Sequence, residues 1–91
     1  MQSRARIVAS GLVQGVFFRA FVRDAAEGLC LTGFVMNRPD GKVEAVAEGE
    51  RHKVIELIGY CRQGPEGSRV EKVEVSWEEP TGEFSGFSMR R

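Results

Sequence analysis

The amino-acid sequence predicts an α+β domain in which a mostly antiparallel sheet carries two helices on one face. Three observations predict this class. Apolar residues alternate in five short segments, they repeat at helical spacing in two others, and glycine or proline turns separate the segments. The resulting order is β-α-β-β-α-β plus a C-terminal strand, which is the split βαβ or ferredoxin-like arrangement.

The first half of the chain contains a strand, a helix and a hairpin. Residues 4–10 alternate in polarity and are expected to form a strand. One helical stripe follows, and it consists of Phe18, Phe21, Val22, Ala25, Ala26 and Leu29. Residues 32–37 and 42–49 read as strands on either side of the turn sequence RPDG, in which Asp40 has a turn role. So short a connection predicts that these two strands pair antiparallel.

The second half repeats the helix and strand pattern. Val54, Leu57, Ile58 and Cys61 predict a helix over about 51–63, and Gly64 with Pro65 ends it. A strand over 70–77 follows, with Val73, Val75 and Trp77 expected in the core. Residues 84–90 alternate through Phe87 and Met89 and predict the terminal strand.

Length and charge limit the classes of protein that fit. Ninety-one residues predict a single domain over residues 1–91. Thirteen basic and thirteen acidic residues give zero net charge, which argues against a general nucleic-acid binder. No apolar run approaches the length of a membrane helix, and the first residues lack the apolar core of a signal peptide. A soluble, cytoplasmic protein without a membrane partner is expected.

The cysteines and the histidine do not predict a metal site. Cys30 and Cys61 are isolated in the sequence, and both occupy apolar positions, so buried free thiols are expected. The sequence alone also allows a single disulfide between them. His52 is alone and is expected to be a solvated surface residue. No metal and no cofactor are therefore expected.

The stretch GLVQGVFFR, residues 11–19, joins the first strand to the first helix. Glycines allow consecutive backbone N–H groups to point to one side, and such a run at a helix N-terminus forms a cradle for an anion. Arg19 would add a planar fork of donors that matches phosphate oxygens. The alternative is that Arg19 extends into solvent, and the residues alone leave both open.

This stretch resembles the signature loop of the acylphosphatase family, GxVQGVxFR. The segment LTGFVMN followed by RPDGKVEAVAEG is similar to the family's second motif, an aromatic strand ending in asparagine that leads into D-G-x-V-E. The pair Gly64–Pro65 and the ending GFSMRR also fit the family layout, so the similarity covers nearly the whole chain.

The resemblance implies a metal-independent enzyme that hydrolyses acyl phosphates to a carboxylate and inorganic phosphate. Arg19 matches the residue that binds the phosphate, and Asn37 matches the residue that orients the attacking water. The implied cradle is built from the backbone amides of Gln14, Gly15, Val16, Phe17, Phe18 and Arg19. A monomer that acts on a small acyl phosphate is expected, without nucleic acid.

Two positions depart from the family pattern. Phe17 stands where a small residue is frequent. Its ring can narrow the mouth of the pocket or pack under the loop, and of these two positions we expect the second. Cys30 stands where the family has a glycine that ends the first helix. A non-glycine residue is strained there if the backbone is left-handed.

The alternative to an enzyme is a binding module of the same fold. RNA-binding domains of this fold stack bases on sheet aromatics, but the aromatic signature of that class is absent. A non-catalytic domain that binds phosphate or an acyl phosphate stays open at this point.

Overall fold

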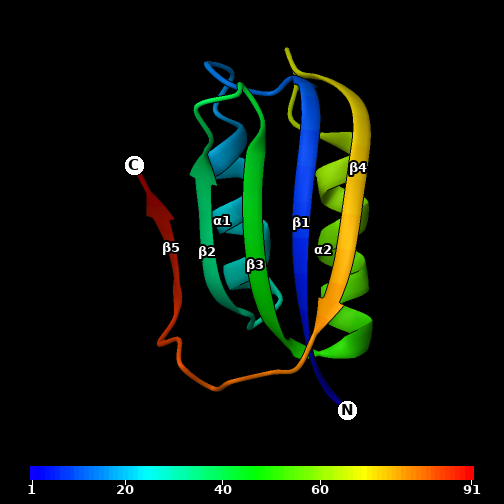
Figure 1. The fold of residues 1–91 in the computed structure, drawn as a ribbon, viewed down its shortest axis with the longest axis vertical. Coiled ribbons are helices and arrows are strands. Elements are labelled where there is room, and N and C mark those ends of the chain that lie inside the picture. Colours follow the sequence, from blue (N-terminus) through cyan, green and yellow to red (C-terminus); the bar gives the residue numbers. More distant parts are fainter.

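The computed structural model describes residues 1–91 as one five-stranded sheet with two helices packed on one face (Figure 1). The elements in chain order are β1 (Gln2–Leu12), α1 (Phe18–Gly28), β2 (Thr32–Asn37), β3 (Val43–Glu50), α2 (Arg51–Gln63), β4 (Arg69–Glu78) and β5 (Phe87–Arg90). The predicted ferredoxin-like order of elements is confirmed. Neither helix has the length and apolar character needed to cross a membrane.

The sheet has the order β4-β1-β3-β2-β5. All neighbours are antiparallel except β2 and β5, which run parallel. The predicted antiparallel hairpin of β2 and β3 is confirmed. Its turn lies at the same end of the sheet as the β1–α1 loop, and β5 points toward that end (Figure 1). Segments distant in the sequence therefore meet at one end of the molecule.

The core lies between the sheet and the helices. Its largest fully buried side chains are Ile7, Val13, Val22, Val35, Val43, Val46, Val54, Leu57 and Cys61, and all but Val46 belong to one apolar cluster. The stripe of α1 is confirmed, because Phe18, Val22 and Ala26 are buried and the other three residues pack against the cluster. Burial raises the pKa of the Cys61 thiol to about 12, so this thiol stays protonated.

β1 is longer than the sequence predicts, because it continues past Ser10 to Leu12. Gly11 makes the extension possible. The pairing with β4 shifts by one residue at this point, and Gly11 has φ 120°. A Cβ there would collide with the carbonyl oxygen of Arg69, so only glycine lets the two backbones approach so closely.

Two side chains that were expected to be buried are exposed. Cys30 lies at the surface, because it occupies the turn that ends α1, whereas Cys61 is buried as expected. Trp77 is 40% exposed because β4 is an edge strand, and its ring carries the Arg51 guanidinium 3.9 Å from the centroid. The core role predicted for Trp77 is therefore wrong.

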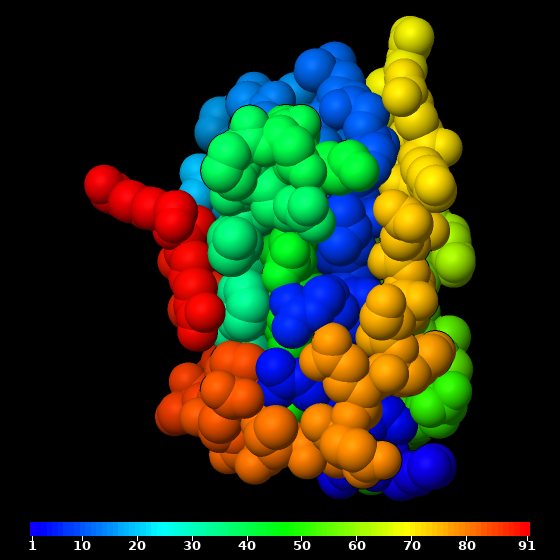
Figure 2. Space-filling view, viewed as in Figure 1, coloured from blue at the N-terminus to red at the C-terminus, as the bar shows by residue number.

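The connection between β4 and β5, residues 79–86, crosses the sheet on the face without helices. Figure 2 shows this segment, in orange, covering the lower part of that face. Within it Phe84 packs edge-on against Phe34 of β2, with ring centroids 5.9 Å apart. The connection places β5 beside β2, on the side of the molecule that carries the α1 N-terminus.

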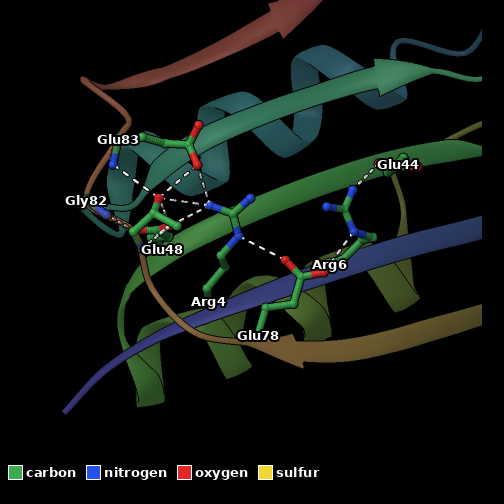
Figure 3. Close-up of polar contacts among 8 residues, drawn as sticks. Arg4, Arg6, Glu44, Glu48, Glu78, Gly82 and Glu83 are labelled. Carbon is green, nitrogen blue, oxygen red and sulfur yellow. Dashed lines mark hydrogen bonds and ion pairs between the residues drawn. The ribbon is translucent and has the colours of Figure 1, made fainter.

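A cluster of ion pairs holds this connection to the sheet (Figure 3). Arg4 Nη1 lies 2.7 Å from Glu48 Oε2, and Arg4 Nε lies 2.9 Å from Glu78 Oε1. The Glu48 carboxylate also accepts hydrogen bonds from the backbone N–H groups of Thr81 and Gly82, both at 3.0 Å. Glu48 is only 5% exposed, so its charge is almost fully satisfied by protein donors.

Candidate active site

The loop that joins β1 to α1 has an irregular backbone. Gly15 has φ 75° and Phe17 has φ 60°, so both adopt left-handed conformations within three residues. Phe17 is the N-cap residue of α1 and provides no side-chain hydrogen bond to the helix. The chain thus enters α1 without the serine, threonine, asparagine or aspartate that usually satisfies the first turn.

Seven consecutive backbone N–H groups, from Gln14 to Ala20, donate no hydrogen bond within the protein. Phe21 is the first residue of α1 whose N–H is paired, to the carbonyl oxygen of Phe17 at 3.0 Å. Unpaired N–H groups at the positive end of a helix dipole bind anions. The loop therefore has the donors and the field of a phosphate site.

A cavity of about 270 Å³ opens beside this loop. Its lining consists of Val13, Gly15, Phe17, Phe18, Arg19, Ala20, Asn37 and Met89. A second hollow is lined by Arg19, Asn37, Met89 and Arg91. Arg19 and Asn37, the two residues singled out in the sequence, thus line both hollows.

Arg19 lies in the first turn of α1 and is half-buried. Its Nη1 donates a hydrogen bond of 2.9 Å to the carbonyl oxygen of Arg90, in β5. The sequence left open whether Arg19 faces an anion site or extends into solvent. In the structure its guanidinium lies beside the cavity and is hydrogen-bonded to β5. The remaining N–H groups of the fork make no hydrogen bond within the protein.

Asn37 is the last residue of β2 and lines the cavity together with the residues of the β1–α1 loop. It is partly buried, and its side-chain amide makes no hydrogen bond within the protein. An amide group offers both a donor and an acceptor, so it can hold a water molecule, but it cannot remove a proton at neutral pH.

Gln14 connects the loop to the β2–β3 turn. Its Nε2 donates to the carbonyl oxygens of Arg38 and Lys42, at 2.8 and 2.9 Å. Within the turn, Arg38 N–H donates to Lys42 O at 2.8 Å, and Lys42 N–H donates to Asp40 Oδ1 at 3.1 Å. The turn role predicted for Asp40 is therefore confirmed, and the Gln14 side chain braces the segment that follows Asn37.

The Phe17 side chain does not pack under the loop as the sequence analysis expected. Its ring is 86% exposed, whereas the next residue, Phe18, is 2% exposed and occupies the core. The left-handed backbone at Phe17 turns its side chain outward at the mouth of the cavity. Of the other predicted cradle residues, Gly15, Phe18 and Arg19 line the cavity, whereas Val16 packs against the core.

The charges around the cavity are positive. Arg19 and Arg91 line the hollows, and no aspartate, glutamate, histidine or cysteine side chain does so. Nowhere in the structure do three or more such side chains gather in a way that could hold a metal ion. The surroundings suit a small anion, and the absence of a cofactor stays a prediction.

Sequence reasoning missed the contribution of β5. Met89 lines both hollows, and the Arg90 carbonyl holds Arg19. These residues belong to a four-residue strand that pairs in parallel with β2. Local alternation predicts the strand but not its partner, so no signal in the sequence connects Met89 or Arg90 to the loop.

Known proteins are similar to this chain over nearly its whole length. The family model described as Acylphosphatase matches residues 5–89. The acylphosphatase of Pelotomaculum thermopropionicum is 50% identical over 88 residues, which are 97% of this chain and 96% of that protein.

Two solved structures are also similar over nearly the whole chain. The crystal structure of acylphosphatase from Bacillus subtilis superposes with a TM-score of 0.94 at 34% identity, covering 100% of both chains. An acylphosphatase from Coxiella burnetii gives 0.92 at 39% identity, covering 98% of this chain and 93% of that one. With the family model and a half-identical relative of matching length, the chain belongs to the acylphosphatase family.

Proposed function

We propose that the chain hydrolyses the carboxyl–phosphate bond of acyl phosphates, with the phosphoryl group held by the β1–α1 loop. The observation that carries the proposal is the run of unpaired N–H groups from Gln14 to Ala20 beside the Arg19 guanidinium. Up to three phosphoryl oxygens can accept from these donors, and the helix dipole favours their charge. The names of the similar proteins support the same substrate class.

The reaction is a displacement at phosphorus. A water molecule held by Asn37 attacks the phosphorus atom, and the bond from phosphorus to the carboxyl oxygen breaks. The leaving carboxylate needs no proton, because the pKa of its acid is about 4. A phosphoryl oxygen accepts the proton of the attacking water, since no acidic or basic side chain of suitable pKa lines the cavity.

Catalysis then depends on position and charge. The amides and Arg19 hold phosphoryl oxygens whose charge is spread over the group in the transition state, and they need little rearrangement to do so. Asn37 lines the same cavity from the end of β2, and its amide can hold the attacking water for in-line displacement.

The sheet face without helices does not favour the alternative of an RNA-binding module. That face carries the ion pairs of Arg4 and Arg6 with Glu44, Glu48 and Glu78, and residues 79–86 cross it (Figure 3). RNA-binding domains of this fold need exposed aromatic rings there on which bases stack. A binding module that holds an acyl phosphate without hydrolysis would share the same cradle, so the test must measure turnover.

The test is the hydrolysis of benzoyl phosphate, followed by ultraviolet absorbance in the presence of EDTA. We expect the wild-type chain to turn over and Arg19→Ala to lose at least about 100-fold in kcat/KM, because a transition-state donor is removed. Arg19→Lys should lose nearly as much, since a point charge does not replace the planar fork. Asn37→Ala should lose kcat while inorganic phosphate still inhibits.

Arg23→Ala is the matched control, because Arg23 lies in the same helix, is paired with Asp24 and does not line the cavity. It should retain wild-type turnover. A folded wild-type chain that binds phosphate without hydrolysing benzoyl phosphate would contradict the enzymatic proposal. It would instead support the alternative of a non-catalytic binding module. An Asn37→Ala variant with normal kcat would contradict the role of Asn37 only.

A further inference from the structure

Phe17 combines two features that are unfavourable for a phenylalanine. Its backbone is left-handed, with φ 60°, a conformation that is strained for a bulky side chain and that glycine, asparagine and aspartate adopt more readily. Its ring is 86% exposed, so the side chain gains almost nothing from burial. Neither the packing of the core nor the turn itself explains a large aromatic residue here.

The exposed ring stands at the mouth of the phosphate cavity. Phe17 lines it together with Met89, which is 42% exposed and comes from β5. The other exposed large apolar residues, among them Leu12, Ile55 and Tyr60, do not line this cavity. Two exposed apolar side chains from different elements thus converge next to the residues that would hold the phosphoryl group.

The chemistry of an acyl phosphate gives this surface a partner. When the phosphoryl group lies against the loop amides, the acyl group must extend from the leaving oxygen toward the open side of the cavity. Binding pockets are mostly apolar with a few convergent polar groups, and five of the eight residues here are apolar. The polar residues serve the phosphoryl group, so the apolar ones are left for the acyl group.

We propose that Phe17 and Met89 form an apolar contact for the acyl group and make the enzyme prefer acyl phosphates with aromatic or aliphatic acyl groups. The proposal rests on the function proposed above and adds the class of acyl group. The contact is made before the bond breaks and persists through the transition state, so its loss is expected in KM more than in kcat.

The experiment compares benzoyl phosphate with acetyl phosphate in the wild type and in Phe17→Gly. Glycine adopts φ 60° without strain, so the backbone of the loop is kept while the ring is removed. We expect the ratio of kcat/KM for benzoyl phosphate to that for acetyl phosphate to fall about tenfold, through a higher KM for benzoyl phosphate. Phe17→Tyr keeps the ring and should restore the wild-type ratio.

Two further variants separate this contact from a general disturbance. Met89→Ser should lower the same ratio, because it removes the second apolar wall. Ile55→Ala removes an apolar side chain that is 51% exposed on α2 and does not line the cavity, and it should leave the ratio unchanged.

The outcomes distinguish the proposal from the function on which it rests. If the wild type hydrolyses neither substrate, the proposed function fails. If it hydrolyses both and Phe17→Gly changes the two kcat/KM values by the same factor, the acyl contact is overturned and the function stands. If kcat falls for both substrates and the ratio of their kcat/KM values stays the same, the acyl contact is likewise overturned. Phe17 would then act only by shaping the backbone of the loop.

Discussion

Arg19 is a cation at the end of a helix that already carries positive charge. The first turn of α1 disfavours such a residue by about 0.3–1 kcal/mol at low ionic strength. One hydrogen bond, to the Arg90 carbonyl, holds the side chain, and the neighbouring N–H groups have no partner in the protein. A bound phosphate would reverse the sign of this interaction, because the guanidinium and the helix end would both face the same anion.

Cys30 shows a second residue in an unfavourable conformation. It has φ 57°, its N–H donates to Glu27 O at 3.0 Å, and the Leu31 N–H donates to Ala26 O at 2.9 Å. These two bonds form the Schellman turn that ends α1, and glycine is preferred at the left-handed position. The strain that the sequence analysis made conditional on a left-handed backbone therefore applies.

We expect Cys30→Gly to raise the free energy of unfolding by about 1 kcal/mol, because the strain of a Cβ at positive φ is removed. Urea denaturation followed by circular dichroism measures the change. Cys30→Ala keeps the Cβ and removes only the thiol, so it should gain nothing. A Cys30→Gly midpoint below that of the wild type would contradict this account.

At the scale of elements, α1 joins a core stripe to an uncapped first turn. The amphipathic stripe and the glycine-rich loop could be predicted from the sequence, because both depend on residues close together in the chain. The position of β5 could not, because its parallel pairing with β2 depends on the path of residues 79–86 across the sheet. The exposed state of Phe17 was missed because a left-handed φ is rare outside glycine.

Gln14 connects the β1–α1 loop to the β2–β3 turn. Its two hydrogen bonds to the β2–β3 turn link the loop to the strand end that carries Asn37. We expect Gln14→Ala to lower the free energy of unfolding by about 1–2 kcal/mol, since two partly buried carbonyls each lose one of their two donors. The kcat for benzoyl phosphate should fall too, because Asn37 is less well fixed.

Gln63→Ala is the control for this prediction, because Gln63 is an exposed glutamine at the end of α2. It should leave both quantities at the wild-type level. Equal stability and equal kcat in the Gln14 and Gln63 variants would show that the bridge to the turn contributes nothing.

At the scale of the whole molecule, the Arg4–Glu48 ion pair and its neighbours hold the β4–β5 connection against the sheet (Figure 3). This connection leads into β5, whose Arg90 carbonyl accepts a hydrogen bond from Arg19. Burial alone would raise the pKa of Glu48. Hydrogen bonds from the Thr81 N–H, the Arg4 guanidinium and the Gly82 N–H outweigh it and lower the pKa to about 2. The charged carboxylate is therefore favoured in the folded state.

Stability should depend on pH through this residue. A lowered pKa in the folded state stabilises the fold above the unfolded pKa of about 4.3, and this contribution is lost as pH falls toward the folded value. We expect the wild-type free energy of unfolding to fall between about pH 5 and pH 2, with Glu48 contributing up to about 3 kcal/mol of the loss. Urea denaturation at a series of pH values measures it.

Glu48→Gln should be less stable than the wild type at neutral pH and should lose less stability over the same acid range. Glu56→Gln changes an exposed glutamate without an ion pair and should keep the wild-type pH dependence. Parallel curves for the wild type and Glu48→Gln would contradict the assignment of acid sensitivity to this cluster.

The claim on which the rest depends is that the unpaired amides of the β1–α1 loop bind phosphate. Titration of ¹⁵N-labelled protein with inorganic phosphate, followed by amide chemical shifts, tests it most directly. The account predicts saturable shifts concentrated in Gly15 to Ala20, with the Arg19 side-chain signal moving at the same phosphate concentration. Shifts that do not saturate, or that spread over basic surface residues such as Arg62 and Lys72 and leave the loop unchanged, would contradict it.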